Sequence, residues 1–498
     1  MNYILRILVF ILVTHSSVSS QQPNILFVIA DDMSHTSAYG YDFVKTPHFD
    51  KLGEEGLRFT HMYTPSSKCS PSRAVILTGR NPWQLEAAAN HRPKWPEKFK
   101  SVIETLVENG YTAGYTGKGW GPGISPKGRQ LTGKEYNQIL KKNRPTKKIA
   151  LYDYAANFEQ FLSEKPKEKP FIFWYGCREP HRDYVYKSGV RLGKSIDEIK
   201  YIPSFWENSE STKHDLLDYA IEVEYFDQQL GKILKHLKKS GELENTLIIA
   251  TSDNAMPFPR YKGHPHEFAT RIPFVVNWPN KIKNRGRICT EFASFIDIAP
   301  TLLEVTGIDN SQSGMHPIQG QSLVDFFDNK VEKRDFVLTG RERNAMVHMD
   351  GKGYPVRSIH KGKWVYMHNF DPERLASGDE ATGYHDTKHS PTKDTILANK
   401  EGKAFQICFG KRPQEELYNI EIDSECMHNL AGEKKFQKLK KEMKKELFTR
   451  LKNQKDPRIL GDPSVFDHVP KHLLKKYDIM VKRNNKYKKM KTKSQGTI

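Results

Sequence analysis

The strongest constraint on the fold of this 498-residue chain is a set of three short apolar runs. Polar or charged side chains follow each run within a few residues. The runs cover residues 24–30, 171–175 and 246–251, and a fourth strand is expected over 111–116. Apolar runs of this length are typical of strands buried on both faces of a parallel sheet. Helical patterns lie between them, at about 101–109 and 213–239. This alternation predicts an α/β fold, a doubly wound sheet with right-handed crossovers.

Two of these runs end in hard oxygen donors. Asp31 and Asp32 follow the first run, and Asp253 and Asn254 follow the run at 246–251. In an open α/β sheet, ligands gather at the carboxyl ends of the strands. One such pair alone would more often be a helix cap or a turn, but the four together suit calcium or magnesium and do not suit zinc.

A different segment, Cys69-Ser70-Pro71-Ser72-Arg73, precedes a short apolar run that stops at Gly79. We expect a short helix with Ser70 as its cap and Pro71 in its first position, which places Cys69 at the amino end. Free amide hydrogens and the helix dipole favour anions there. An exposed, acidic thiol with Arg73 one turn away would suit an oxyanion substrate such as sulfate, phosphate or carboxylate. The alternative is a buried structural cysteine at an ordinary helix start.

The Cys-x-Pro-Ser-Arg spacing closely resembles the signature of the type I sulfatases, whose cysteine is oxidised after translation to formylglycine. The resemblance implies an alkaline-phosphatase-like sulfatase fold, with a large mixed, mostly parallel sheet flanked by helices and a small C-terminal antiparallel-sheet subdomain. It also implies that a formylglycine hydrate at position 69 attacks the sulfur of a sulfate ester. The implied ligands of a Ca²⁺ ion, in preference to Mg²⁺, are Asp31, Asp32, Cys69, Asp253 and Asn254.

The same resemblance assigns roles to further residues. Arg73 would orient the hydrated aldehyde, and Lys118 and Lys262 would hold the sulfate oxygens. A histidine is expected to protonate the leaving group, with His181 as the first choice and His264 as the second. Taken singly, each lysine would be assigned to the surface and each histidine to a structural role. Many family members carry a histidine two residues after the lysine matched to Lys118, whereas this chain has Trp120.

Composition divides the chain into four parts. Residues 1–20 are predicted to be a cleavable signal peptide, because Arg6 precedes a short apolar run and small residues stand before Gln21. Residues 21–335 would form the catalytic domain, 336–460 a C-terminal α+β subdomain, and 461–498 a basic, partly mobile tail. The signal predicts a periplasmic or secreted protein, and no other apolar stretch approaches membrane length.

An oxidising compartment permits disulfides. With Cys69 reserved for chemistry, four cysteines remain, and Cys408 with Cys426 is the more plausible pair by proximity, although the sequence does not establish it.

The net charge of +19 owes much to basic residues at 434–445 and 471–493. A basic surface attracts nucleic acid nonspecifically, but a secreted chain rarely meets it, so an acidic polysaccharide is the expected partner. Solvated surface lysines are the alternative. The tryptophans Trp83, Trp95 and Trp120 could stack on sugar rings, and core packing is the equal alternative. The run Asn90-His91-Arg92 follows the Cys69 helix and is a candidate contact for uronate or sulfate groups.

Within the family, the segments around Cys69, His181 and Asp253 look closest to the heparan N-sulfatase (sulfamidase) branch, which also includes many bacterial polysaccharide sulfatases. We therefore expect a sulfatase acting on a sulfated polysaccharide or its oligosaccharides, for instance a marine algal glycan such as ulvan. Its other partner would be a formylglycine-generating or anaerobic sulfatase-maturing enzyme. The alternatives are an N-sulfoglucosamine sulfohydrolase acting on heparan-type glycans, a phosphoesterase on the same fold, and a non-catalytic protein that binds acidic glycans.

Overall fold

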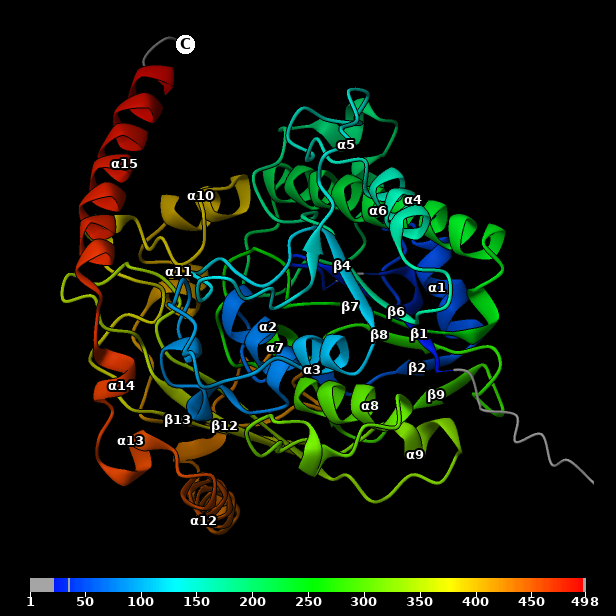
Figure 1. Ribbon diagram of the computed structural model, residues 1–498. Helices are drawn as coiled ribbons and strands as arrows, with labels where there is room; N and C mark the ends of the chain where they lie inside the picture. Colours follow the sequence, from blue (N-terminus) through cyan, green and yellow to red (C-terminus); the bar gives the residue numbers. More distant parts are fainter. Residues whose placement is uncertain (1–21, 35, 496–498) are drawn as a thin grey trace, which may run out of the picture.

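The computed structural model describes residues 22–34 and 36–495, so the signal peptide predicted at 1–20 lies outside the described residues. Its centre is an eight-stranded sheet in the order β5-β4-β6-β1-β7-β8-β2-β9 (Figure 1). The three predicted apolar runs form the buried middle of this sheet as β1 (Asn24–Ala30), β6 (Phe171–Gly176) and β7 (Thr246–Ser252). β1 pairs in parallel with both β6 and β7, so the polar ends of these strands share one edge.

The sheet is parallel on one side of the central strands and mixed on the other. On the parallel side, β4 (Thr112–Gly117) and β5 (Lys134–Glu135) continue the arrangement of β6. On the mixed side, β8 (Phe274–Asn277) runs antiparallel to both β7 and β2 (Leu57–Phe59). β9 (Arg287–Cys289) closes that side parallel to β2. Two further short strands, β3 (Met62–Tyr63) and β10 (Ala293–Ser294), pair separately.

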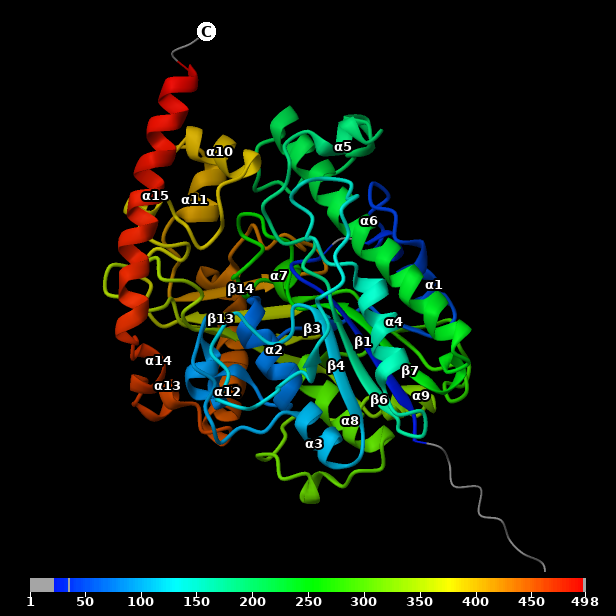
Figure 2. The same cartoon turned by 45° about the horizontal axis from the view of Figure 1, so that its top comes forward.

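Helices cover both faces of the large sheet (Figures 1 and 2). One face carries α1 (Pro47–Glu54), α4 (Tyr154–Glu164) and the long α6 (Glu210–Lys239). The other carries α2 (Cys69–Thr78), α3 (Val102–Glu108) and α8 (Ile298–Val305). In α6 the apolar residues recur at helical spacing and are buried, which fixes the helix on the sheet. The shorter helices are α5 (Ser188–Arg191), α7 (Glu267–Thr270) and α9 (Val324–Phe327).

A second sheet follows in the chain, with four antiparallel strands in the order β11-β12-β13-β14. These are β11 (Phe336–Arg341), β12 (Val356–Lys361), β13 (Trp364–Asn369) and β14 (Glu415–Asn419). The helix α12 (Gln437–Asn453) buries Met443, Leu447 and Leu451 in the same apolar cluster as residues of this sheet. The predicted small C-terminal antiparallel sheet is therefore present.

The lysine-rich segment at the end of the chain forms a helix where composition predicted a partly mobile tail. This helix, α15 (Lys471–Gln495), follows α13 (Pro457–Leu460) and α14 (Ser464–Asp467). In both views it lies beside α10 (Pro391–Ala398) and α11 (Lys403–Phe409) (Figures 1 and 2). Leu473 and Asn484 of α15 are buried, so the helix has anchors that the charge pattern did not reveal. Across the described ranges, the structure contains no helix with both the length and the apolarity needed to cross a membrane.

Candidate active site

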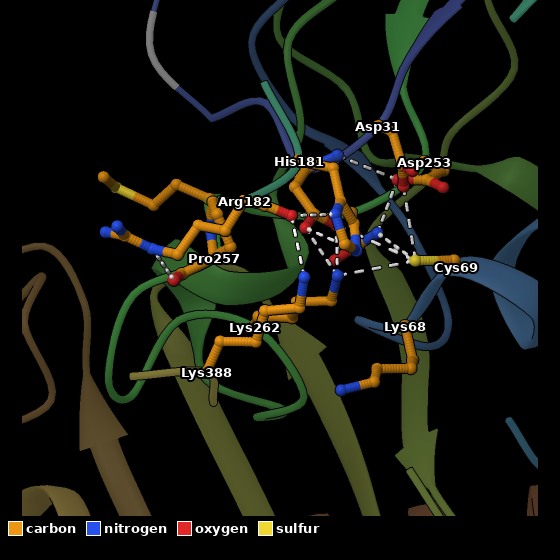
Figure 3. Close-up of polar contacts among 12 residues, drawn as sticks. Asp31, Lys68, Cys69, His181, Arg182, Asp253, Pro257, Lys262 and Lys388 are labelled. Atoms are coloured by element: carbon orange, nitrogen blue, oxygen red, sulfur yellow. Dashed lines mark hydrogen bonds and ion pairs between the residues drawn. The ribbon is translucent and has the colours of Figure 1, made fainter. Parts of the chain in front are cut away.

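Four side chains converge at the edge of the sheet where β1 and β7 end. Asp31 and Asp32 follow β1, Asp253 follows β7, and Cys69 begins α2. One ligand atom from each lies within 4.8 Å of the others, and all four residues are buried (Figure 3). Asp32 has a φ of 75°, which is uncommon outside glycine, and its N–H donates to Asp253 Oδ1 at 3.1 Å. These contacts hold the acidic side chains together around the Cys69 sulfur.

The donor set fits a hard divalent cation. Asn254 lies beside the cluster, with its Nδ2 at 3.8 Å from Cys69 Sγ. Its buried Oδ1 has no hydrogen-bond partner among the described residues. An unsatisfied buried acceptor costs about 1–3 kcal/mol, and a cation at this point would satisfy it. Oxygen ligands suit calcium and magnesium whereas a thiol does not, so residue 69 fits this set once an oxygen function replaces its sulfur.

Three cations neutralise the three aspartates. Lys118 Nζ lies 2.8 and 2.7 Å from the two oxygens of Asp31. Lys262 Nζ lies 2.6 and 2.5 Å from those of Asp32 and also 3.5 Å from Cys69 Sγ. Burial opposes ionisation of Asp31, but Lys118 and neighbouring cations outweigh it and hold the pKa of this carboxyl well below its usual value.

Arg73 is the third cation and is fully buried. Its Nε lies 2.7 Å from Asp253 Oδ2, and its Nη1 donates to the carbonyl oxygens of Lys118 and Gly119 at 2.9 and 3.0 Å. This guanidinium therefore joins α2 to the ends of β7 and β4 and fixes the positions of Asp253 and of the Lys118 backbone.

The Cys69 thiol is buried and neutral, so the predicted exposed, acidic thiol is wrong. Desolvation, followed by the charge of Asp31, raises its pKa to about 12. Its Sγ donates to Asp31 Oδ1 at 3.3 Å. The helix begins at Cys69 itself, with Lys68 rather than Ser70 at the cap position and Pro71 in the third helical position. No side chain caps this first turn, so the positive end of the helix dipole faces the acidic cluster.

His181 lies in the loop that follows β6. Its Nδ1 contacts the Arg182 carbonyl oxygen at 2.6 Å, and its Nε2 lies 3.9 Å from Asp32 Oδ2. Burial and the charge of Lys262 lower the pKa of this histidine to about 4. Arg182 is buried and paired with both oxygens of Asp215 at 2.7 and 2.8 Å, which secures the loop. The Nε2 atom of His181 thus faces the cluster from a fixed position.

A cleft of about 330 Å³ opens beside the cluster. Its charged and polar lining includes Asp32, Lys68, His91, Arg92, Arg178, His181, Arg182, Lys262, His385, Asp386, Lys388 and Lys476. Cations outnumber acids in this lining, so the cleft favours an anionic molecule.

Comparison with known proteins gives the family. Residues 23–308, more than half of the chain, match the family described as Sulfatase. The chain belongs to the sulfatase family. Residues 261–357 also match the region described as N-sulphoglucosamine sulphohydrolase, C-terminal. The sulfatase is accordingly a sulfuric ester hydrolase. Its family generally uses a formylglycine residue and a divalent metal. The acidic cluster at Cys69 is the candidate site for that metal.

Two curated relatives cover most of the sulfatase. An ulvan-active sulfatase of Formosa agariphila is 28% identical over 449 residues, which is 89% of this chain and 82% of that protein. The N-sulphoglucosamine sulphohydrolase of Homo sapiens is 26% identical over 484 residues, covering 89% of this chain and 93% of that protein.

A solved structure from work on glycosaminoglycan metabolism by Bacteroides thetaiotaomicron has a TM-score of 0.65 at 19% identity. It covers 88% of this chain and 98% of its own. Together with the two sheets described above, this likeness confirms the predicted alkaline-phosphatase-like sulfatase fold.

His264 is the predicted site residue that the sulfatase does not bring to Cys69. It is buried, its Nε2 contacts Ser377 Oγ at 3.4 Å, and it is absent from the lining of the cleft. Desolvation lowers its pKa well below the usual value, so it stays uncharged. The other predicted residues lie at the cluster or directly beside it: Asp31, Asp32, Cys69, Arg73, Lys118, His181, Asp253, Asn254 and Lys262.

Of the two roles open for the tryptophans, the structure supports core packing over sugar contact. Trp83 and Trp95 are each 1% exposed and belong to apolar cores. Trp120 packs edge-to-face against Trp95 at 5.0 Å and does not line the cleft. Asn90 is buried too, where it accepts from the Arg343 N–H at 2.9 Å.

All five cysteines are buried and unpaired, so the bridge suggested between Cys408 and Cys426 is wrong. The two thiols instead lie in separate apolar clusters. Proximity in sequence did not bring them together, because Cys408 lies in α11 and the strand β14 intervenes before Cys426.

Several cleft residues were missed by sequence reasoning. Lys68 Nζ donates to Asp386 Oδ1 at 3.1 Å, and Asp386 also accepts from Arg341 Nη2 at 2.7 Å. Lys68 could have been suspected because it precedes Cys69. Asp386, Lys388 and Lys476 come from parts of the chain where no local pattern marks them as site residues.

Proposed function

We propose that this sulfatase hydrolyses sulfate esters on a sulfated polysaccharide or its oligosaccharides, with Cys69 converted to formylglycine. The observation that carries the proposal is the convergence of Cys69 with hard oxygen donors and two lysines beside a cationic cleft. The named activities of the two curated relatives support a sulfated glycan as substrate.

Asp31, Asp32, Asp253 and Asn254 would hold the cation, with Ca²⁺ preferred to Mg²⁺, and bound Ca²⁺ would polarise the sulfate and acidify the nucleophile. A hydrated aldehyde at position 69 would offer one hydroxyl for attack on sulfur and a second whose deprotonation releases sulfate. Residue 69 stands at an uncapped helix start, which favours the negative charge that develops there.

The remaining side chains would act on the sulfate ester itself. Lys118 and Lys262 reach the cluster with their ammonium groups and would bind the sulfate oxygens as their charge grows. Arg73 would act as a positioning residue through Asp253. His181 would give a proton from Nε2 to the leaving oxygen, because its Nδ1 is engaged with the Arg182 carbonyl. An anionic substrate would raise the low pKa of this histidine toward the working range.

Maturation and compartment follow from the same proposal. Cys69 is 1% exposed, so a formylglycine-generating or anaerobic sulfatase-maturing enzyme would reach it before the chain has folded. The predicted signal peptide at 1–20 supports a periplasmic or secreted enzyme.

The test is sulfate release from defined oligosaccharides derived from ulvan and from heparan-type glycans, with O- and N-sulfated members assayed separately. The enzyme is co-expressed with a maturing enzyme, and Cys69→Ala and Cys69→Ser serve as blanks. Intact mass should show a loss of about 18 Da when the thiol becomes an aldehyde. We expect sulfate release only from the matured wild type, and equal release by the blanks would refute the proposal.

A second candidate is favoured by a specific observation. The match of residues 261–357 to the C-terminal region of N-sulphoglucosamine sulphohydrolase supports N-sulfate cleavage on heparan-type glycans. Release from the N-sulfated members alone would select this candidate. Faster turnover of a phosphate ester than of its sulfate analogue would select a phosphoesterase, and an unmodified thiol with glycan binding would select a non-catalytic protein.

A further inference from the structure

Most cations of the cleft have a partner within the chain. Lys262 pairs with Asp32, Lys68 with Asp386, and Lys388 Nζ donates to the Arg182 carbonyl oxygen at 2.8 Å. Arg92, Arg178 and Lys476 differ, because within the described ranges no hydrogen bond or ion pair joins any of these three side-chain cations to another residue. Of these three cations without counter-charges, Arg92 and Lys476 are the two whose charges act on each other.

Arg92 is tied to the reactive centre through its backbone. Its N–H donates to Ser70 Oγ at 3.3 Å, and Ser70 directly follows Cys69 in α2. The neighbouring His91 N–H donates to the Arg343 carbonyl oxygen at 2.8 Å. The Arg92 backbone is therefore fixed next to residue 69, while its side chain is exposed in the cleft.

Lys476 is placed by the anchoring of α15. Asn484 Nδ2 donates to the Ala381 carbonyl oxygen at 3.1 Å, and the Tyr487 ring stacks on His389 with 3.9 Å between centroids. Leu473, one turn before Lys476, is buried and lines the cleft. These contacts seat α15 on the segment that also supplies residues 385–388 to the cleft. In Figures 1 and 2, α15 continues past α10 along the same side of the molecule.

The two cations affect each other. Burial, and after it the charge of Arg92, lowers the pKa of Lys476. Like charges held close together repel, and an anion bound between them would turn this repulsion into attraction. A guanidinium fork and an ammonium together match a carboxylate or a sulfate.

We propose that Arg92 and Lys476 form a second anion subsite, which binds a carboxylate or sulfate on the sugar unit next to the one that loses its sulfate. The proposal rests on the proposed function and narrows its substrate class to glycans that carry anionic groups on neighbouring units. The first sulfate would be held at Lys118 and Lys262, and the second group would fix the register of the glycan along the cleft.

The test compares two ligands of the same backbone, a sulfated disaccharide with a uronate carboxylate and its analogue in which that carboxylate is reduced to the alcohol. Dissociation constants are measured by calorimetry on the Cys69→Ala protein, which cannot turn over either ligand. Arg92→Gln and Lys476→Gln are each expected to weaken the uronate ligand about ten-fold more than the reduced ligand, as for loss of a hydrogen bond to a charged group.

Lys475→Gln is the matched control, because Lys475 is the exposed neighbour of Lys476 on α15 and does not line the cleft. This variant removes the same charge from the same helix. The ratio of its dissociation constants for the uronate ligand and the reduced ligand should equal that of the parent protein. In the matured enzyme, the variants at Arg92 and Lys476 should raise KM for the uronate substrate more than they lower kcat.

Three results would each overturn the subsite. The Arg92 and Lys476 variants could lose equal affinity for both ligands, Lys475→Gln could weaken binding as much as Lys476→Gln, or the parent could fail to bind the uronate ligand. Its failure is distinguishable from that of the proposed function. A protein that shows the ligand preference but releases no sulfate keeps the subsite and loses the hydrolase mechanism.

Discussion

Lys68, the residue before Cys69, owes its position to Asp386, which lies 318 residues further along the chain. Asp386 is buried between Lys68 and Arg341, and these cations hold the pKa of its carboxyl well below the usual value. Residue by residue, the site consists of such pairs: Lys118 with Asp31, Lys262 with Asp32, and Arg73 with Asp253. Removing the partner of a buried charge lowers the free energy of unfolding far more than removing the partner of an exposed charge.

Asp386→Asn should destabilise the enzyme by about 3 kcal/mol, because two buried cations lose their shared counter-charge. Urea unfolding measures this change, and kcat/KM on the same samples should fall because Lys68 is released into the cleft. Asp183→Asn is the control, since Asp183 is exposed and its pair with Lys388 spans 3.7 Å. A control that costs as much as Asp386→Asn would contradict the assigned role.

At the scale of elements, helices are held by residues of other helices. α1 begins after Thr46, whose side chain makes no capping hydrogen bond. Asp227 of α6 accepts from the N–H groups of His48 and Phe49 at 3.2 and 2.7 Å instead. A carboxyl from one helix therefore satisfies the first turn of another and fixes their relative position.

Asp227 predicts a pH dependence of stability. Burial raises its pKa to about 7 in the folded protein, despite the hydrogen bonds from α1. The folded state therefore binds more protons than the unfolded state between about pH 4 and pH 7, and this contribution to stability is lost as the pH rises through that window.

Asp227→Asn keeps an acceptor for α1 and cannot ionise. The difference in unfolding free energy between variant and wild type should shift in favour of the variant by about 2–4 kcal/mol between pH 5 and pH 8. Urea unfolding at several pH values measures this shift. Asp50→Asn, at a half-buried carboxyl of α1, is the comparison variant, and a difference for Asp227→Asn that stays constant with pH would contradict the assignment.

For the molecule as a whole, the acidic cluster is a junction between segments that are distant in sequence. It joins the ends of β1 and β7 to the start of α2, and Lys118 adds the end of β4. Any ion bound there would favour the folded chain, because the unfolded chain cannot assemble these ligands. Folding and metal affinity should therefore be linked.

Ca²⁺ at 100 times its dissociation constant should stabilise the metal-free enzyme by about 2.7 kcal/mol, and a chelator should reverse the gain. Calorimetric Tm measured with and without Ca²⁺ tests this. Asn254→Ala removes the unpartnered amide oxygen and should reduce the Ca²⁺-dependent rise in Tm. A Tm that is independent of Ca²⁺ in the wild type would refute the metal site.

The sequence by itself determined the central strands, the polar groups at their ends and a short helix with Cys69 near its amino end. These features depend on hydrophobic periodicity and on residues close together in the chain, and parallel strands place their ends at one edge of the sheet. Strand order and direction were not determined, because the antiparallel β8 and the short β2 and β9 are paired by contacts across the sheet.

Only the tertiary structure decided the burial of Cys69, the unpaired state of the other cysteines, the pairing of Lys68 with Asp386, and the place of α15 on the cleft. Burial raises the pKa of the Cys69 thiol, which the local sequence alone predicted to be acidic. The buried side chains of Leu473 and Asn484 anchor α15, although the composition of this helix is typical of a solvated segment. The physical reason is the same in each case: desolvation and long-range pairing depend on which distant segments fold against one another, and local residue patterns carry no information about that choice.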